Sequence, residues 1–231
     1  MSGPRGDDPA EYASPACFAH ELDPADGSWD GGDPQGRARI LRWRKTVRER
    51  LIAARLATAA EERRRFSALI ETHLEAAIGT VSGLIVSAYS PFRGEPILRN
   101  LLKSVLAREG RTALPVVVAP GQPLLFRLWS PGDPTERGVW NIPVPSSRAQ
   151  VVVPDVVIAP VVGFDPACFR LGYGGGFFDR TLASFARRPR VFGIGYSQAA
   201  LRTIHPLAHD IAMDAIVTER GVVTRPARRA P

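Results

Sequence analysis

Apolar side chains recur at three- and four-residue steps over two stretches in the first third of the chain. From residue 37 to about residue 56 the spacing is that of one face of an amphipathic helix. A second helix is expected to follow directly, with a buried stripe of its own, and to end near residue 80. The two stripes consist of Ile40, Trp43, Val47, Leu51 and Ala54 in the first helix, and Phe66, Leu69, Ile70 and Leu74 in the second.

Beyond residue 80, short apolar runs alternate with helical patterns. Residues 95–110 and 175–188 predict helices, whereas residues 135–147 form a proline-rich stretch that is expected to be irregular. Strands that alternate with helices are typical of an α/β fold with a mostly parallel sheet. We therefore expect a single α/β domain in which helices flank the sheet. The expected strands are 83–90, 114–121, 124–129, 156–164, 190–197 and 214–219.

The two ends of the chain depart from this pattern. Residues 1–36 are rich in Gly, Pro, Asp and Ser and show little periodicity, so we expect an extended or disordered N-terminal arm. Residues 223–231 are rich in arginine and are expected to form a basic C-terminal tail. The α/β domain is predicted to span residues 37–222.

The charge is distributed unevenly. The formal net charge is +7, and basic residues gather in the first helix, in ERRRF and in the C-terminal tail. A basic helix suits either an anionic small ligand or nucleic acid. The sequence has neither a zinc-type spacing nor an interleaving of aromatic with basic residues, the two patterns that would favour specific nucleic-acid binding. No apolar run approaches the roughly 20 residues of a membrane helix, and the N-terminus has no apolar signal region, so we expect a cytoplasmic protein without a membrane partner.

The stretch RLGYGGGFFDR, residues 170–180, comes directly after an apolar run. Ligands of open parallel sheets bind at the carboxyl ends of strands, and glycines permit positive φ and a close approach of the backbone. Inward-pointing amides, a following helix N-terminus and the guanidinium of Arg170 favour an anion. The stretch matches neither the Walker A nor the dinucleotide pattern. Two interpretations stay open: a phosphate cradle and a plain strand-to-helix turn.

Asp179 follows the glycines in the first turn of the expected helix. Its carboxylate either complements the positive end of the helix or binds Mg²⁺ beside a bound phosphate. Magnesium usually takes one or two carboxylates, with water and phosphate oxygens as the other ligands. The segment HDIAMD offers Asp210 and Asp214 as further oxygen ligands. We expect Asp179 and Asp214 to bind the metal.

Three blocks in this order, AYSPFRGEP, WNIPVP and RLGYGGGFFDR, resemble the 5-formyltetrahydrofolate cyclo-ligase family, also called methenyltetrahydrofolate synthetase. PDVVIAPVVGFD and GIGYS…HDIAMDAIVTE add to the resemblance, which covers residues 37–222. It implies a single α/β domain that binds ATP, Mg²⁺ and 5-formyltetrahydrofolate. It also implies that the γ-phosphoryl group moves to the formyl oxygen and that folate N10 attacks the resulting imidate phosphate. The products are 5,10-methenyltetrahydrofolate, ADP and phosphate.

The resemblance also assigns residues position by position. In the family a basic residue and an arginine four positions later contact the ATP phosphates, and Arg44 and Arg48 match them, with Lys45 beside the first. Glu95 matches a glutamate that contacts the pterin, and Trp140 matches an aromatic residue of the folate site. The expected catalytic residues are Arg170 and Asp179, the expected ATP-binding residues are Arg44, Lys45, Arg48, Arg170, Gly172, Tyr173, Gly174, Gly175, Gly176, Phe177 and Phe178, and the expected substrate-binding residues are Tyr89, Glu95, Trp140 and Phe178.

The sequence departs from the family's pattern at three places. Cys168 stands where glycine is usual, residues 1–36 form an unusual leader, and Phe177 and Phe178 lack the usual tyrosine. The missing phenol hydrogen bond is worth about 0.5–1.5 kcal/mol. Two alternatives therefore stand beside an efficient cyclo-ligase: a folate- or ATP-binding paralogue with altered substrate or lost turnover, and a basic nucleic-acid-binding protein. We expect a monomer or weak homo-oligomer that acts on small molecules.

Overall fold

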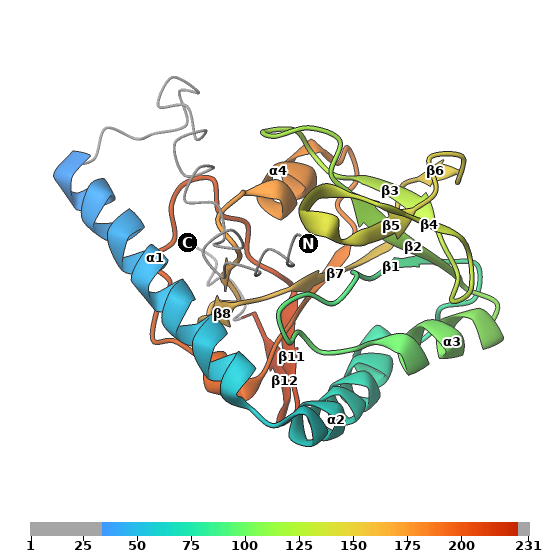
Figure 1. The fold of residues 1–231 in the computed structure, drawn as a ribbon, viewed down its shortest axis with the longest axis horizontal. Helices are drawn as coiled ribbons and strands as arrows, with labels where there is room; N and C mark the ends of the chain where they lie inside the picture. Colours follow the sequence, from blue (N-terminus) through green and yellow to red (C-terminus); the bar gives the residue numbers. More distant parts are fainter. Residues whose placement is uncertain (1–33, 226–231) are drawn as a thin grey trace, which may run out of the picture.

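The computed structural model describes residues 34–225. All but the last three residues of the expected N-terminal arm lie outside this range, as does the end of the expected basic tail. Two helices open the described part of the chain (Figure 1): α1 (Pro34–Ala57) and α2 (Ala60–Ile78). The first begins three residues before its expected start, so the end of the expected arm is helical.

The centre of the fold is an 8-stranded sheet in the order β12-β11-β10-β7-β1-β2-β3-β6. The strands from β11 to β2 run parallel, whereas β12 at one edge and β3 and β6 at the other pair antiparallel. This topology confirms the mostly parallel α/β fold. The strands are β1 (Ile85–Ser87), β2 (Arg111–Val116), β3 (Leu125–Leu128), β6 (Val151–Val152), β7 (Val156–Pro160), β10 (Arg190–Ile194), β11 (Ala215–Thr218) and β12 (Gly221–Thr224).

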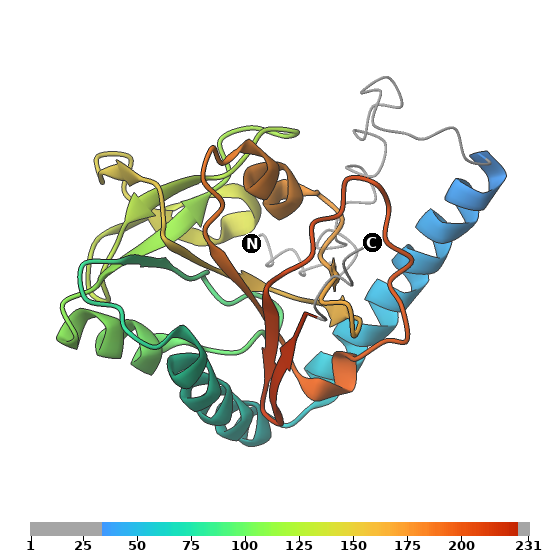
Figure 2. The ribbon, with the colours of Figure 1, turned by 180° about the vertical axis from the view of Figure 1, so that it is seen from behind.

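Helices cover both faces of the sheet (Figures 1 and 2). On one face lie α2 and α3 (Arg99–Ala107), where Leu74 and Leu101 enter the core. On the other face lies α4 (Phe177–Ser184), whose Leu182 packs in a second core cluster. Each helix therefore covers the sheet with its apolar stripe, as expected for an α/β layer architecture.

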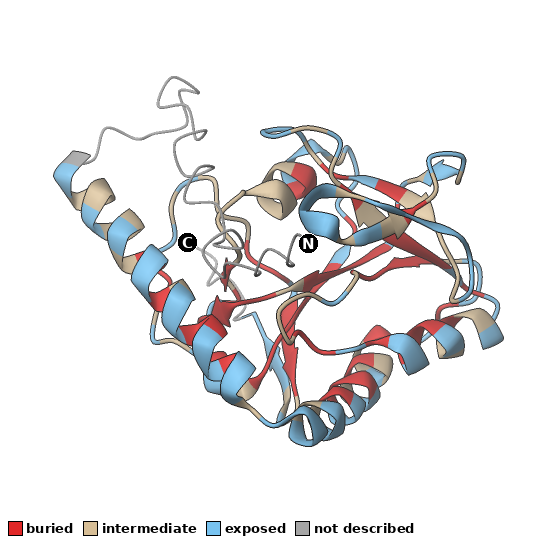
Figure 3. Cartoon of the chain, in the orientation of Figure 1, coloured by how far each residue is buried: buried red, intermediate tan, exposed pale blue. Residues whose placement is uncertain are grey.

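Strand β7 is buried on both faces (Figure 3). Its Val156 and Ile158 belong to the core under α2 and α3, and its Val157 and Ala159 belong to the core under α4. Alternate side chains of a strand point to opposite faces, so a strand covered on both sides is continuously apolar. This explains why the sequence there lacks the polar–apolar alternation of a half-exposed strand.

Helix α1 packs beside the sheet rather than on one of its faces. Its Val47 and Leu51 form a third core cluster with Leu171 and Ile204. Both segments that meet α1 follow the carboxyl ends of parallel strands, one after β7 and the other after β10. The basic helix predicted from the sequence therefore lies close to the segments expected to bind ligand.

Two short hairpins were not expected. β4 (Thr135–Arg137) and β5 (Pro143–Pro145) lie within the stretch predicted to be irregular, on either side of a 3₁₀ turn, η3 (Val139–Asn141). β8 (Gly163–Phe164) and β9 (Arg170–Leu171) fold back on each other after β7. The glycine-rich stretch therefore follows a hairpin, and not the long buried strand directly.

Several bounds also differ from those expected. The third helix begins at Arg99 rather than residue 95, and β12 continues through Thr224, so the expected tail starts inside the sheet. Ala54 and Leu69, expected in the buried stripes, are exposed, because no neighbouring element covers the side of the helix on which each lies. A further 3₁₀ turn, η4 (Ser197–Ala199), follows β10. Within the described residues, no helix combines the length and the apolar character needed to cross a bilayer.

Candidate active site

The order of the parallel strands changes direction between β1 and β7. From β1 the sheet continues to β2 and β3, and from β7 it continues the other way to β10 and β11. Ligands of open α/β sheets bind at such a switch point, outside the carboxyl ends of the strands. Tyr89 and Glu95 follow β1 at this edge. The glycine loop, residues 171–176, follows β7 and the β8–β9 hairpin at the same edge.

The glycine loop lies against α1 and leads into α4. The carbonyl of Gly172 accepts a hydrogen bond from Nε of Arg48 at 2.7 Å. Gly174 has φ +105° and Gly176 has φ +61°, conformations that glycine adopts without strain. A Cβ on Gly174 would lie 3.5 Å from the guanidinium carbon of Arg48. An anion in this loop would therefore meet backbone amides, a helix N-terminus and a guanidinium.

Arg48 is the basic residue of α1 that faces the glycine loop. Burial lowers its pKa to about 10, and the positive charge of Arg44 acts in the same direction. The guanidinium is still cationic at neutral pH, and a partly desolvated cation attracts an anion more strongly than one in water. Lys45, the other basic candidate beside Arg44, is exposed to solvent.

Arg44, expected to contact ATP phosphates, has three protein partners in the structure. Its Nε donates to the carbonyl of Ile204 at 3.1 Å, and its Nη2 donates to the carbonyl of His205 at 2.9 Å. The same guanidinium forms an ion pair with Asp210, and both side chains are buried. Arg44 therefore fastens the segment after η4 to α1, a role that the sequence did not indicate because the partners are 160 or more residues away.

Arg170 and Asp179 form an ion pair across the glycine loop, with Nη2 and Oδ2 2.7 Å apart. The other carboxylate oxygen, Oδ1, accepts the N–H of Ile211 at 3.2 Å. The guanidinium of Arg170 lies 5.1 Å from the ring centroid of Phe178, and its Nε is buried without a hydrogen-bond partner. A Cβ on Gly172 would lie 2.6 Å from Nη1 of Arg170, so a larger residue there would displace the guanidinium of this pair.

Asp214 does not join Asp179 at the glycine loop. It lies at the amino-terminal edge of β10 and β11, where it pairs with Arg188 at 2.9 Å and accepts the N–H of Val191 at 2.7 Å. Asp210 is paired with α1. Within residues 34–225 no three His, Cys, Asp or Glu side chains are grouped so that they could hold a metal ion. Asp179 stays the expected Mg²⁺ ligand at the glycine loop, since an ion that arrives on nucleotide phosphates needs only one or two carboxylates.

Glu95 is buried and has three partners. Its Oε2 accepts the N–H of Phe92 at 2.9 Å, and its Oε1 accepts the O–H of Tyr173 at 2.9 Å and lies 3.8 Å from Nη1 of Arg55. Burial raises the pKa of Glu95 to about 7, although Arg55 and the two hydrogen bonds each act to lower it. A carboxyl group with this pKa is typical of functional sites.

Two tyrosines fix the backbone on either side of Glu95. The hydroxyl of Tyr89 donates to the carbonyl of Pro96 at 2.9 Å, and that of Tyr196 donates to the carbonyl of Gly94 at 3.1 Å. Burial raises the pKa of Tyr89 well above its usual value, so the hydroxyl stays protonated and donates. The hydroxyl of Tyr89, expected to contact substrate, is therefore used to hold the segment that carries Glu95.

Trp140 lies at the turn of the β4–β5 hairpin and contacts the start of α4. Its ring centroid is 6.0 Å from that of Phe177, with the planes at 73°. Both views of the ribbon show this turn beside α4 (Figures 1 and 2). Trp140 is 39% exposed, and its φ is +57°, a strained value for a bulky residue. The aromatic residue expected at the folate and the loop expected at ATP are therefore neighbours.

Arg55 is a site residue that the sequence analysis missed. It lies in the last turn of α1, is 4% exposed, and approaches the carboxylate of Glu95. Its Nη2 is buried without a hydrogen-bond partner, and its guanidinium lies 5.9 Å from the ring centroid of Tyr173. Its spacing from Arg48 could have indicated Arg55 from the sequence, because seven residues are about two helical turns and place both side chains on the same face of α1.

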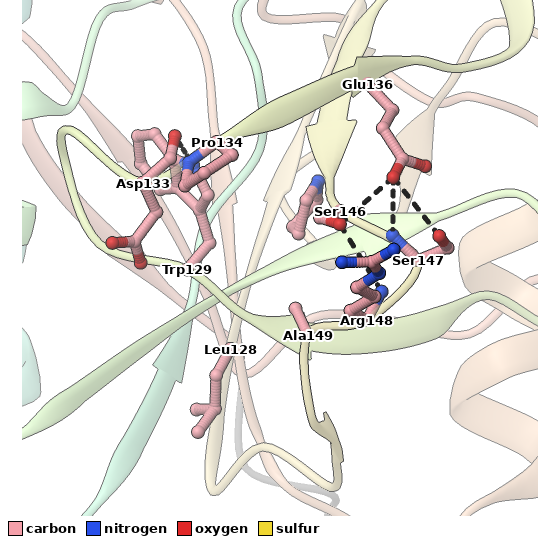
Figure 4. Close-up of a pocket in the computed structure, with 10 residues that line it drawn as sticks. Leu128, Trp129, Asp133, Pro134, Glu136, Ser146, Ser147, Arg148 and Ala149 are labelled. Carbon is pink, nitrogen blue, oxygen red and sulfur yellow. Dashed lines mark hydrogen bonds between the residues drawn. The ribbon is translucent and has the colours of Figure 1, made fainter.

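A cavity of about 620 Å³ lies elsewhere, between the β3–β4 turn and the segment after β5 (Figure 4). Within it, Glu136 accepts hydrogen bonds from Ser146 and Ser147. None of the expected site residues lines this cavity. The chemistry-bearing residues gather instead at the carboxyl edge of the sheet, so we place the candidate active site there.

The 5-formyltetrahydrofolate cyclo-ligase family model matches residues 40–219. A 5-formyltetrahydrofolate cyclo-ligase of Mycolicibacterium smegmatis is 34% identical over 74% of this chain and 95% of that protein. The solved 5,10-methenyltetrahydrofolate synthetase of Aquifex aeolicus is 27% identical and superposes with a TM-score of 0.69 over 81% of this chain and 95% of its own. That of Mycoplasma pneumoniae shares the fold at 19% identity, with a TM-score of 0.63 over 76% of this chain and 98% of its own.

Proposed function

The chain belongs to the 5-formyltetrahydrofolate cyclo-ligase family, and from that premise we propose that it converts 5-formyltetrahydrofolate into 5,10-methenyltetrahydrofolate with ATP as phosphoryl donor. The observation that carries the proposal is the hydrogen bond from Tyr173 to Glu95. One residue belongs to the loop that suits phosphates, and the other is the carboxylate that suits a pterin. Two substrates that react with each other need such adjacent sites.

The glycine loop and its basic neighbours support binding of the ATP phosphates. Arg48 lies against Gly172 and Gly174, and the N-terminus of α4 begins directly after Gly176. Arg170 keeps one buried Nε–H without a partner beside the same loop. Phosphoryl transfer depends mainly on positioning and on positive charge around the moving group, and these groups supply both.

Asp179 is the residue that fits a magnesium ion carried by the nucleotide. Both of its oxygens already accept hydrogen bonds, and a carboxylate oxygen has a second lone pair for a metal. When bound, the ion supplies positive charge that offsets the negative charge of the phosphates. Asp179 orients Arg170 whether or not the ion is bound, because their ion pair lies within the protein.

The reaction balances in two steps. The formyl oxygen attacks the γ-phosphorus, the bond from that phosphorus to the β–γ bridging oxygen breaks, and ADP leaves. The N10 lone pair then attacks the formyl carbon, the carbon–oxygen bond breaks, and phosphate leaves while N10 loses its proton. Phosphorylation is needed because the unmodified formyl oxygen is a poor leaving group.

Glu95 and Trp140 support binding of the folate. A buried carboxylate can accept hydrogen bonds from the N–H groups of a pterin, and the pKa of Glu95, about 7, keeps both its forms accessible at neutral pH. The half-exposed indole of Trp140 offers a flat apolar surface next to Phe177. The folate would therefore contact the carboxylate on one side and the hairpin turn on the other.

A direct assay tests the proposal. Purified protein is mixed with 5-formyltetrahydrofolate, ATP and Mg²⁺, and the near-ultraviolet band of the methenyl product is followed together with ADP release. We expect one ADP per methenyl product and no product when ATP is omitted. Absence of product above the enzyme-free control at high protein concentration would contradict the cyclo-ligase activity and favour a binding paralogue.

Two variants provide matched controls. Arg48→Met removes a guanidinium at the glycine loop and is expected to reduce turnover at limiting ATP. Arg148→Met removes a guanidinium at the cavity of Figure 4, away from the expected site residues, and is expected to leave turnover unchanged. Equal loss in both variants would contradict the location of the active site.

A further inference from the structure

Tyr173 connects the two proposed substrate sites. Its hydroxyl donates to Oε1 of Glu95 across 78 positions of sequence, whereas its backbone belongs to the glycine loop. Its ring packs 6.0 Å from that of Phe92 and lies beside the guanidinium of Arg55. Burial raises the pKa of Tyr173, so its hydroxyl is a donor throughout the physiological range.

The two ends of this hydrogen bond differ in how firmly they are fixed. Tyr89 and Tyr196 bond the carbonyls on both sides of Glu95, so the backbone of Glu95 is clamped. Tyr173 is half-buried and is followed by Gly174 at φ +105°. The carbonyl before it, that of Gly172, bonds Arg48. A ligand that contacts the glycine loop therefore acts on Tyr173 more readily than on Glu95.

We propose that Tyr173 is a positioning residue that couples the two sites: nucleotide contact with the glycine loop sets, through the hydrogen bond from the Tyr173 hydroxyl, the direction of the Glu95 carboxylate that receives the folate. The inference rests on the proposed function, because it takes the glycine loop as the nucleotide site and Glu95 as the folate site. Coupling of this kind is reciprocal, so the folate must strengthen nucleotide binding by the same factor.

The charge state of Glu95 provides a readout that a merely structural role would not move. The hydrogen bond from Tyr173 favours the carboxylate and opposes the larger effect of burial, so its removal raises the pKa of Glu95 above about 7. If the folate requires the charged carboxylate, then acidification abolishes folate binding at a higher pH in the variant than in the wild type, because Glu95 is protonated at a higher pH. The charged and titratable groups around Glu95 and the Tyr173 hydroxyl are Arg55 of α1, Arg63 of α2, Tyr89 and Arg93 after β1, Tyr173 of the glycine loop and Tyr196 after β10.

Tyr173→Phe is the variant that tests the inference, and Tyr196→Phe is its matched control. Each removes one phenol hydroxyl near Glu95, but the hydroxyl of Tyr196 donates to the backbone carbonyl of Gly94 instead of the carboxylate. Calorimetry measures the affinity for 5-formyltetrahydrofolate from pH 5.5 to 8.5, with and without the magnesium complex of adenylyl imidodiphosphate. This readout does not depend on turnover.

For the wild-type protein we expect the ATP analogue to tighten folate binding about fivefold or more. In Tyr173→Phe this factor should fall to near one, and the acidic midpoint of folate binding should move to higher pH. In Tyr196→Phe the coupling factor and the acidic midpoint should stay as in the wild type, although the folate affinity itself and the melting temperature fall because the carbonyl of Gly94 loses its donor. Turnover of Tyr173→Phe should drop about tenfold at pH 6.5, the size expected for one hydrogen bond to a charged group.

The outcomes separate the inference from the proposed function. The inference would be overturned if Tyr173→Phe kept the wild-type coupling factor and the wild-type acidic midpoint of folate binding, even if its turnover fell. It would also be overturned if Tyr196→Phe changed both quantities as much as Tyr173→Phe. A wild-type protein that binds both ligands without coupling would also overturn it while leaving the cyclo-ligase activity intact. A wild-type protein that couples the ligands but forms no methenyl product would overturn the proposed activity and support the inference.

Discussion

The guanidinium of Arg170 and the carboxylate of Asp179 meet at 2.7 Å between β9 and the first turn of α4, with side chains only 5% and 13% exposed. These two elements bracket the glycine loop, so the ion pair fixes the distance between its ends. The same carboxylate also accepts the backbone N–H of Ile211, which ties the loop to the segment before β11. Asp179 thus has a structural role besides any role toward the nucleotide.

Replacement of Asp179 by asparagine is expected to destabilise the fold. Arg170 would keep its buried charge without a counter-charge, which costs about 3 kcal/mol in the free energy of unfolding. Asp214→Asn is the matched control, because it breaks an exposed ion pair. The side chains of Arg188 and Asp214 are 39% and 46% exposed, and exposed pairs contribute about 0–1 kcal/mol to the free energy of unfolding. Urea denaturation of both variants measures the difference. Equal destabilisation would show that burial of the Arg170 pair is unimportant.

The glycine loop offers a separate test of phosphate binding. Gly174→Ala and Gly132→Ala place a Cβ at nearly the same φ, +105° and +112°, so each should cost about 1–3 kcal/mol of stability. Gly132 lies in the β3–β4 turn with no atom within 4 Å of the added Cβ, whereas the Cβ on Gly174 faces Arg48. We expect only Gly174→Ala to weaken binding of the ATP analogue, by about tenfold or more as for a lost charge-assisted contact. If Gly174→Ala bound the ATP analogue with unchanged affinity, the glycine loop would be only a strand-to-helix turn.

Much of the fold followed from sequence because its signals are local. The apolar run of β7 and the stripes of α1 and α2 directly reflect burial. The β4–β5 hairpin was missed because β5 begins and ends with proline and another proline stands directly before β4, and strands with few ladder bonds have a weak pattern. Gly175 was expected to bind ATP along with Gly174 and Gly176, yet it is not among the glycines with positive φ, and an added Cβ would meet the ring of Phe177 at 2.7 Å.

The site was predicted less completely than the fold, since its contacts join distant segments. The glycine loop, Glu95 and Trp140 are indeed brought together, through Tyr173 and Phe177. Arg44 and Arg48 have the same side-chain chemistry one helical turn apart, and only the tertiary structure assigns one to Asp210 and the other to the loop. The sequence contained no signal for these pairings.

The raised pKa of Glu95 predicts a pH dependence of stability. Its folded pKa of about 7 lies above its ordinary value of 4.5, so the folded state binds more protons between these values than the unfolded state does. The contribution of Glu95 to stability is then largest at low pH and declines as pH rises, by up to roughly 1.4 kcal/mol per pH unit. Glu95→Gln removes this slope. We expect Glu95→Gln to gain stability relative to the wild type between pH 5 and pH 7.5, measured by urea denaturation.

A difference between the two proteins that stays constant with pH would contradict the raised pKa. Glu136→Gln is a suitable comparison, because Glu136 is fully exposed and its hydrogen bonds to Ser146 and Ser147 lower its pKa. The relative stability of Glu136→Gln should therefore show no rise over the same pH window.

Arg44 and Arg48 are expected to respond oppositely to the same substitution. Arg44→Met leaves the buried carboxylate of Asp210 without its arginine partner and frees two backbone carbonyls, so the free energy of unfolding should fall by about 3–5 kcal/mol. The fraction that remains folded should bind the ATP analogue with nearly unchanged affinity. Arg48→Met loses one hydrogen bond to Gly172 and should cost only about 1 kcal/mol of stability. It should weaken binding of the analogue about tenfold or more, because the guanidinium beside Gly174 is gone.

Lys45→Met completes this comparison, because it removes a positive charge from the exposed side of the same helical turn. Exposed substitutions usually change stability by less than about 0.5 kcal/mol, and Lys45 has no contact with the glycine loop that would affect the nucleotide. Calorimetry with the ATP analogue and urea denaturation of the three variants therefore assign each basic residue of α1 separately. Arg44 would be assigned to phosphate binding if Arg44→Met weakened nucleotide binding as much as Arg48→Met does and the Arg44→Met variant kept the wild-type stability. Only a nucleotide contact could then account for the loss, because the buried pair with Asp210 would have proved dispensable to the fold.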